Sequence, residues 1–328
     1  MAVGSASKIA LWRRCKKKAW YRDILKIVRR IQNLAPSKGT LIHKSLQYHY
    51  NGQDWTQPIK SFVLDLENVF DEERAEWIDL PQEAYRIIRG YLLAYKDVDA
   101  KIRTLETEYQ FEIPLGKHTY TGTIDWVFED DQGVWVADHK TVKTLPELSD
   151  LYMDIQTLMY VEAVNILKLA EKPLGVVFNH IRTKAPRVPA LLKSGGVSKA
   201  ACDTDVRTYF EAVKSAGLNP EDYRDMLDKL KSNIFFKRTK IPTPTKTIDI
   251  IKKEIGATLD EVALYTHIAK DKGEKAEHLF PRNMMKQRCA WDCEYYPICF
   301  GELAGMNTQG IIEDKYTAKE ERYDDEQE

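Results

Sequence analysis

The sequence lacks any long apolar run. No stretch reaches the ~18 consecutive apolar residues that a membrane-spanning helix requires, so we expect neither a transmembrane segment nor a membrane partner. The N-terminal segment Met1–Lys18 also lacks the apolar core of a secretory signal peptide. We therefore expect an intracellular, cytoplasmic protein.

A net charge of either sign is missing as well. Lys and Arg number 49 and Asp and Glu number 50, so the overall charge of -1 identifies no partner. The basic residues nevertheless concentrate in residues 8–30, together with Trp12, Trp20 and Tyr21. That segment either binds phosphates and stacks on bases or is a solvated helix face, and charge alone favours the second interpretation. The acidic end, residues 304–328, is expected to be a disordered tail.

Cysteine is scarce, and the count of 5 is odd, which argues against a disulfide framework in a cytosolic chain. Cys289, Cys293 and Cys299 follow the spacing C-x3-C-x5-C, which is typical of thiolates that bind zinc or an iron–sulfur cluster. Both groups normally need four ligands, and the fourth has to come from far along the chain. Cys15 and Cys202 remain for that role.

The pattern of apolar residues predicts an α/β core. A length of 328 residues fits one large domain with an insertion, or two domains. Helical spacing and strict alternation distinguish the expected helices from the expected strands. The predicted helices are residues 9–33, 40–52, 82–97, 149–170, 206–216, 220–232 and 245–271, and the predicted strands are residues 105–115, 120–129, 134–142, 174–182 and 233–241.

One predicted hairpin carries an unusual charge pattern. If strands 120–129 and 134–142 turn at Asp131-Gln132, Asp125 lies opposite Asp138, and Lys140 shares the face of Asp138. Two facing carboxylates are tolerable when a cation lies between them, and oxygen ligands suit Mg²⁺ or Mn²⁺. The alternative is a solvent-facing strand end at which Lys140 offsets the two aspartates.

The helix that follows adds a polar pair. Gln156 and Tyr160 are four residues apart and therefore share one face of the predicted helix 149–170. Such a pair is usually an ordinary helix surface. Here it lies on the element expected to pack beside the strand that carries Lys140, which favours a site.

Several segments together resemble a known family. "GTIDWVF", "VADHK" and "QTLMY" resemble the second, third and Q-x-x-x-Y motifs of RecB-type nucleases in the PD-(D/E)xK superfamily. "GTLIHKSLQYHYNG" is similar to the first motif of that group, and "SKIALWRRCKKKAWYRDI" with "CAWDCEYYPIC" resembles its iron–sulfur members. Those members include AddB-type helicase–nucleases, CRISPR-adaptation nucleases and bacteriophage exonucleases.

The resemblance implies roles for individual residues. Asp125, Asp138, His43 and the backbone carbonyl of His139 would be metal ligands, and Lys140 would be the catalytic lysine. Gln156 and Tyr160 would contact the DNA backbone near the scissile phosphate. Arg182 and Lys184, which follow the fourth strand, would guide the DNA strand.

The resemblance also implies a cluster and a domain plan. Cys15, Cys289, Cys293 and Cys299 would hold a 4Fe-4S cluster, with zinc as the second choice, and Cys202 would be a free thiol. The familiar spacing in this family is C-x2-C-x5-C, so this chain has one extra residue. The fold would be a restriction-endonuclease-like core, a central mixed sheet flanked by helices, in one nuclease domain over residues 1–303. Within it we expect core residues 40–185 and 233–242, a helical insertion over 186–280, and a cluster staple formed by 7–30 and 286–303.

The function implied is a Mg²⁺- or Mn²⁺-dependent DNA exonuclease of recombination or DNA-end processing, encoded by a bacteriophage and acting in the bacterial host cytoplasm. Its partners would be DNA with a single-stranded end and a recombinase or single-strand annealing protein. Two alternatives stay open. One is a DNA-binding or scaffold protein of nuclease fold that does not cleave, and the other is a structure-specific endonuclease on the same core.

Overall fold

The computed structural model describes residues 1–29, 38–66, 77–152, 154–200 and 203–318. The chain divides into two compact units, and the expected single nuclease domain over residues 1–303 stays a prediction. Unit 1 comprises residues 1–34, 110–123 and 244–328, and unit 2 comprises residues 35–109 and 124–243. Both chain ends therefore belong to unit 1, and the predicted core belongs mainly to unit 2.

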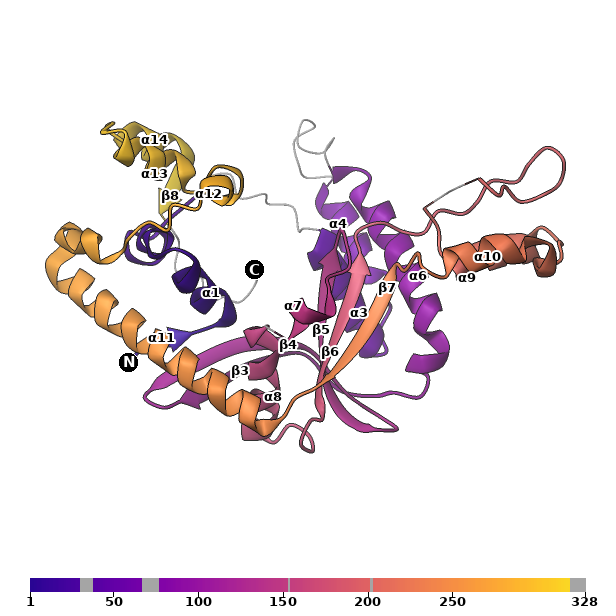
Figure 1. Cartoon of the computed structure of the whole chain (residues 1–328), viewed down its shortest axis with the longest axis horizontal. Coiled ribbons are helices and arrows are strands. Elements are labelled where there is room, and N and C mark those ends of the chain that lie inside the picture. The colour runs from indigo at the N-terminus through magenta and orange to yellow at the C-terminus, as the bar shows by residue number, and fades with distance from the viewer. Residues whose placement is uncertain (30–37, 67–76, 153, 201–202, 319–328) are drawn as a thin grey trace. The chain divides into compact units, whose positions relative to one another are not determined.

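A mixed β-sheet organises unit 2 (Figure 1). Its strands pair in the order β1 (Val3–Gly4)–β4–β5–β6–β7, and β3 pairs with β4 off this path. The pairs β1–β4 and β5–β6 are parallel, and the pairs β4–β5 and β6–β7 are antiparallel. The bounds are β3 (Arg103–Leu115), β4 (His118–Asp130), β5 (Gly133–Val142), β6 (Gly175–Arg182) and β7 (Phe236–Pro242). These five strands were predicted, the first three of them from alternation, and the α/β class with a central mixed sheet is confirmed.

The β4–β5 hairpin has the predicted register. Its turn lies at Asp131-Gln132, where the Asp130 side chain accepts a hydrogen bond from the Gln132 amide at 3.0 Å. Trp126 therefore pairs with Ala137, and Phe128 pairs with Trp135. These four side chains form one buried apolar cluster with Val177 of β6. The apolar face is thus confirmed, and it fixes which side chains point the other way.

Helices cover both faces of this sheet. α3 (Lys38–Tyr50), α4 (Gln57–Leu66) and α6 (Leu80–Asp99) share a buried apolar cluster that includes Ile181 of β6. They lie on the face of Ala137 and His139, because Tyr50 of α3 stacks on Trp126 with ring centroids 3.9 Å apart. α8 (Ile155–Leu167) packs on β5 and β6 from the other face, since Gln156 contacts Lys140.

The predicted helix 149–170 is interrupted. α7 (Leu148–Leu151) is a short first piece, and α8 begins anew at Ile155. Asp154 caps the start of α8 by accepting a hydrogen bond from the Thr157 amide at 3.1 Å. Because an aspartate in this extended conformation satisfies an otherwise unpaired helix N–H, the break is built into the sequence.

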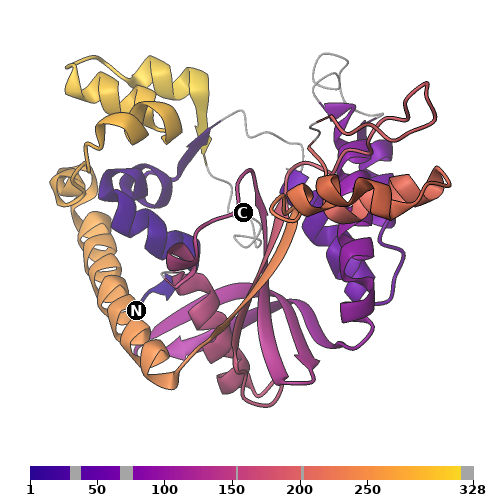
Figure 2. The same cartoon turned by 45° about the vertical axis from the view of Figure 1, so that its right-hand side comes forward.

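The segment between β6 and β7 has a small core of its own. α9 (Val206–Ser215), η2 (Pro220–Tyr223) and α10 (Arg224–Leu230) bury Tyr209, Val213 and Leu230 together. In Figures 1 and 2 these helices lie beyond the sheet edge, beside α3 and α6. Residues 244–280, which the predicted insertion includes, belong to unit 1 in the structure.

Unit 1 joins the two ends of the sequence. Figure 2 shows α1 beside the long helix α11, and Trp12 of α1 donates to Glu261 of α11 at 2.9 Å. Strand β2 pairs with β8 through Arg29 and Tyr316, so β2 ends the predicted helix 9–33 early. The bounds are β1 (Val3–Gly4), α1 (Ala6–Arg14), α2 (Lys16–Ala19), η1 (Trp20–Ile24), β2 (Ile27–Arg29), α11 (Thr245–Lys272), η3 (Gly273–Leu279), α12 (Lys286–Asp292), α13 (Tyr296–Leu303), α14 (Gln309–Lys315) and β8 (Tyr316–Ala318).

The structure bears on two interpretations of the chain ends, the base-stacking alternative for residues 8–30 and the expected disordered tail. Trp12, Trp20 and Tyr21 are at most 3% exposed in the core of unit 1, so they are not available to stack on bases. Within the expected disordered tail, residues 309–318 form α14 and β8 instead, because the buried Tyr316 anchors that segment on the core. Residues 319–328 lie outside the described part of the chain.

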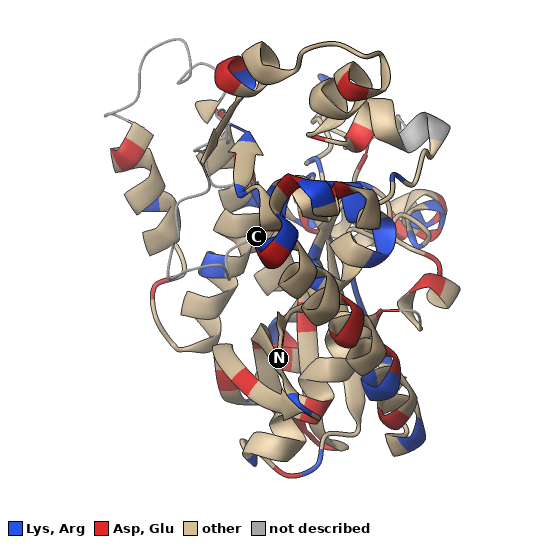
Figure 3. Ribbon diagram, turned by 90° about the vertical axis from the view of Figure 1, so that its left-hand side faces the viewer, with Lys and Arg blue, Asp and Glu red and all other residues tan. Residues whose placement is uncertain are grey.

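Charge is spread rather than gathered. In the view of Figure 3, Lys and Arg alternate with Asp and Glu along the helices, in keeping with a net charge of -1. Among the described helices, none is long and apolar enough to cross a bilayer.

Candidate metal and catalytic site

The site begins where the β4–β5 ladder stops. The paired residues end at Trp126 and Ala137, and Asp125 and Asp138 are the next residues on each strand. The His139 amide donates to the Asp125 carboxylate at 2.6 Å. The Asp138 side chain is 1% exposed and that of Asp125 is 11% exposed. The hairpin therefore brings two carboxylates together in a nearly dry position.

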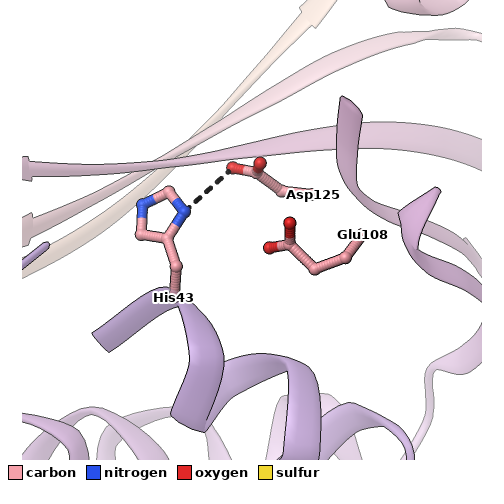
Figure 4. Close-up of side chains that lie close together, drawn as sticks. All are labelled: His43, Glu108 and Asp125. Atoms are coloured by element: carbon pink, nitrogen blue, oxygen red, sulfur yellow. Dashed lines mark ion pairs between the residues drawn. The ribbon is translucent and has the colours of Figure 1, made fainter. Parts of the chain in front are cut away.

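Three side chains converge at a spacing that suits one cation (Figure 4). His43 of α3, Glu108 of β3 and Asp125 of β4 each offer a ligand atom, and these atoms lie within 4.8 Å of one another. His43 Nδ1 is 3.7 Å from Asp125 Oδ2. Among the described residues no other set of three or more His, Cys, Asp or Glu meets this spacing. Carboxylate oxygens and one imidazole fit Mg²⁺ or Mn²⁺.

Glu108 was missed by the sequence analysis. It lies in an alternating strand with Glu106 and Glu112, and nothing in that pattern distinguishes it. Its backbone φ of 44° lies in the left-handed region, which is rare for a residue with a side chain and rarer inside a strand. The distorted backbone accompanies the inward position of the Glu108 carboxylate. The local sequence gives no sign of this distortion, so we attribute it to tertiary structure.

Asp138 stands apart from these three residues. Its Oδ1 is 3.1 Å from Lys140 Nζ, whereas its Oδ2 is buried with no hydrogen-bond partner among the described residues. A buried carboxylate oxygen without a partner is costly. A cation beside Oδ2 and Asp125 would satisfy it, so the donor set fits a divalent ion.

The electrostatics of the site indicate the same need for a cation. Burial raises the pKa of Asp138 to about 7 and that of Asp125 to about 6. Burial, with repulsion from Asp125, raises the pKa of Glu108 to about 8. Burial also lowers the pKa of His43, which leaves the imidazole neutral and able to ligate. Without a cation, the carboxylates therefore resist ionisation. A bound divalent cation would favour their ionised form, as expected of a metal site.

Lys140 is held in its charged form. Burial opposes its charge, but Asp138 and Asp125 outweigh burial and raise the pKa of Lys140. Its ammonium donates to the Gln156 side-chain oxygen at 2.9 Å, and Gln156 in turn donates to the Tyr160 hydroxyl. The structure thus brings together the predicted lysine and the predicted helix pair.

The two cationic residues at the end of β6 differ. Arg182, the last residue of β6, is engaged within unit 2, because its guanidinium lies 3.2 Å from the Asn233 side chain and stacks 4.3 Å from the Phe235 ring. Lys184, just beyond the strand, is exposed. Of this predicted pair, Lys184 is the more exposed to solvent.

The cysteines form a separate neighbourhood in unit 1. Cys293 and Cys299 pack against the buried apolar cluster of unit 1, and Cys15 and Cys289 belong to the same unit. Arg282 donates to Cys299 Sγ at 3.2 Å, and the four thiols are free. Four cysteines from both ends of the sequence therefore lie in the same unit, and the nearby cations Arg14 and Arg282 pair with Asp292 and Glu302. Cys202, the competing ligand, lies outside the described residues.

The positions of the thiols can be compared with those that a zinc ion requires. A tetrahedral zinc site with Zn–S bonds of about 2.3 Å brings its sulfur atoms within about 3.8 Å of one another. Among the described residues, no three thiols come within 4.8 Å. A cavity of about 300 Å³ lies beside Cys15, lined by unit 1 residues that include Arg13, Arg14, Lys16 and Arg282.

The comparison with protein families agrees with this architecture. The model of the PD-(D/E)XK nuclease superfamily matches residues 4–300, and the chain belongs to that superfamily. Nucleases of this superfamily use divalent metal ions, and membership implies DNA as the substrate. A search of curated proteins found no match.

Proposed function

We propose that this protein is a Mg²⁺- or Mn²⁺-dependent DNA exonuclease whose centre lies at the end of the β4–β5 hairpin. The observation that carries the proposal is the His43, Glu108 and Asp125 group, with the unpartnered Asp138 Oδ2 and the charged Lys140 beside it. Carboxylates, an imidazole and a lysine in a buried position suit hydrolysis of a phosphodiester.

Each residue has a definable role. His43, Glu108, Asp125, Asp138 and the His139 backbone carbonyl would hold the divalent ion, which when bound lowers the pKa of water and offsets phosphate charge. Lys140 stabilises the negative charge that develops on the phosphate during attack. The hydrogen bond from Lys140 to Gln156 fixes the ammonium, and Gln156 and Tyr160 contact the DNA backbone.

We assign the chain to the RecB-type iron–sulfur group within the superfamily. The motifs that contain His43, Asp125, Asp138 and Gln156 occur in the order of that group, and the four cysteines all belong to unit 1. Cys15, Cys289, Cys293 and Cys299 would hold a 4Fe-4S cluster, as the cysteine motifs that resemble those of the iron–sulfur members suggest, with zinc as the second choice. In this assignment the cluster is structural and the carboxylate site performs the chemistry.

The substrate we propose is DNA with a single-stranded end, in recombination or DNA-end processing within the cytoplasm of a bacterial host. Lys184, exposed after β6, guides the strand, while Arg182 acts chiefly within the protein. A recombinase or single-strand annealing protein would be the partner that receives the processed end.

End-labelled linear DNA and a covalently closed circle with Mn²⁺ test this proposal. Linear DNA should be shortened from its ends and the circle should persist. Lys140→Ala and Asp138→Ala should each reduce the rate by about 100-fold or more, whereas Lys143→Ala, an exposed lysine just beyond β5, should not.

Other outcomes identify the alternatives. Cleavage of the closed circle would indicate an endonuclease, and DNA binding without cleavage in any divalent ion would indicate a scaffold. Wild-type rates in Lys140→Ala and Asp138→Ala would show that the site is assigned wrongly.

A further inference from the structure

A buried polar network lies behind the carboxylates. His139 is on the opposite face of β5 from Asp138 and Lys140, and its ring is 2% exposed. Its Nδ1 is 2.6 Å from the side-chain amide of Asn179, a fully buried residue on β6. Because that amide nitrogen can only donate, His139 Nδ1 accepts and the imidazole carries its proton on Nε2. The ring also stacks on Tyr50 and Trp126.

The network continues to a buried ion pair. The Asn179 amide also donates to the Tyr91 hydroxyl at 2.7 Å. Arg238 of β7 donates to that hydroxyl from Nε at 3.1 Å and to the Tyr50 hydroxyl from Nη2 at 2.9 Å. Its Nη2 also pairs with Asp99 at 2.9 Å, and the two charged side chains are only 10% and 12% exposed. Every link lies within unit 2.

The other end of the network is the site itself. The His139 backbone N–H holds the Asp125 carboxylate at 2.6 Å, and His139 lies between Asp138 and Lys140 in sequence. Because the His139 ring is packed against Tyr50 and Trp126 and hydrogen-bonded to Asn179, residue 139 has little freedom to shift in the strand. The network thus restrains the backbone position from which this N–H holds the Asp125 carboxylate.

We propose that Asp99, Arg238, Tyr91 and Asn179 are positioning residues that act through His139 to orient the Asp125 carboxylate for metal binding. The proposal rests on the metal site of the proposed function. Burying an ion pair is rarely the cheapest way to stabilise a core, because apolar packing often does as well. A network that orients a ligand explains why charge is retained here, as outer partners of metal ligands typically contribute 10–100-fold in affinity.

The test is the affinity of the metal-free protein for Mn²⁺, measured by isothermal titration calorimetry. The variants are Asn179→Leu, which removes the link to His139, and Tyr91→Phe, which removes one hydroxyl. The matched control is Tyr209→Phe, since Tyr209 is also fully buried in unit 2 and donates to the Ser198 carbonyl at 3.0 Å. We expect all three to lower the melting temperature. Only the two network variants should weaken Mn²⁺ binding, by about 10-fold or more.

The outcomes separate positioning from simple packing. Mn²⁺ affinities of Asn179→Leu and Tyr91→Phe within twofold of that of Tyr209→Phe would overturn the proposal. If Asn179→Leu does not fold, Tyr91→Phe decides alone. If the wild-type protein binds Mn²⁺ but does not cut DNA, the proposed nuclease function is wrong. The Mn²⁺ affinities of the variants then still decide whether the network positions Asp125. Wild-type protein that binds no Mn²⁺ would overturn both.

Discussion

At the scale of single residues, Glu108 is the proposed ligand whose role is easiest to separate from folding. Glu108→Gln keeps the shape and removes the charge. Without metal, the variant should melt at a higher temperature, because burial and Asp125 oppose ionisation of Glu108. With Mn²⁺, its stabilisation should fall and its half-maximal Mn²⁺ concentration should rise by about 10-fold.

The matched control for this variant is Glu112→Gln. Glu112 lies on the same strand β3 and is exposed. Thermal melts with and without MnCl₂ check both variants. Equal metal responses in Glu108→Gln and Glu112→Gln would remove Glu108 from the site.

The carboxylates also predict how stability depends on pH. The folded-state pKa values of Asp125 and Asp138 are raised from 3.8 to about 6 and about 7, chiefly by burial. The folded state therefore binds more protons than the unfolded state between these limits. The metal-free protein has the full contribution of these groups below about pH 4 and loses it as pH rises through about 7.

Because a divalent ion binds the ionised carboxylates, the increase in melting temperature with Mn²⁺ should be larger at about pH 8 than at about pH 5.5. Asp138→Asn should flatten the pH dependence of the metal-free protein. An equal Mn²⁺ effect at both pH values would contradict this assignment of pKa shifts.

Local sequence predicts part of this site and not the rest. Asp125, Asp138 and Lys140 could be placed together because side chains repeat every two residues along a hairpin and its turn is short. Gln156 could be placed because the helix after a strand usually packs beside it. Glu108 could not, because its position depends on a left-handed backbone angle inside a strand that alternates regularly.

At the scale of elements, two glycines give opposite predictions. Gly175 begins β6, and a Cβ there would lie 2.2 Å from the Ile241 carbonyl oxygen of β7. Gly175→Ala should force β7 away and lower stability by about 1–3 kcal/mol. Gly256 lies inside α11, where an added Cβ would meet nothing within 4 Å, so Gly256→Ala should raise helix stability by about 0.5–1 kcal/mol.

Chemical denaturation followed by circular dichroism measures both effects. The pair also controls for the substitution itself, since each adds one methyl group to a glycine. An unchanged free energy of unfolding in Gly175→Ala would mean that the close approach of β6 and β7 does not limit the residue at this position. A lower free energy of unfolding in Gly256→Ala would mean that the added methyl group is itself destabilising in α11.

Element types were easier to predict than element limits. Strands β4 and β5 were predicted because alternation is a local property. The break at Asp154 and the strand at 27–29 depend on a cap and on pairing with residues 316–318. The pairing partner of β2 lies nearly 290 residues away in the sequence, so no local pattern reveals the strand. The predicted helix 9–33 therefore extended too far.

At the scale of the whole molecule, unit 1 is stabilised at two levels. The first is present in the polypeptide itself. The buried cluster joins Trp12, Trp20 and Tyr21 to Phe280, Tyr295 and Tyr316, and Lys17, 1% exposed, pairs with Glu302 at 2.9 Å. The second level is the cluster that we assign to Cys15 and the three C-terminal cysteines. We therefore expect that loss of the proposed iron–sulfur cluster weakens unit 1 but does not unfold it completely.

Anaerobically purified wild-type protein should therefore be brown, with a broad visible absorbance and about four iron atoms per chain. Cys15→Ser should lose most of that absorbance, and Cys202→Ser should keep it. Because metal-site binding energy contributes to folding energy, Cys15→Ser should also expose residues 6–29 to hydrogen exchange while the sheet of unit 2 stays protected. A colourless wild-type protein with one zinc per chain would instead show that the thiols close to zinc spacing on binding, and an unchanged spectrum in Cys15→Ser would exclude Cys15 as the fourth ligand.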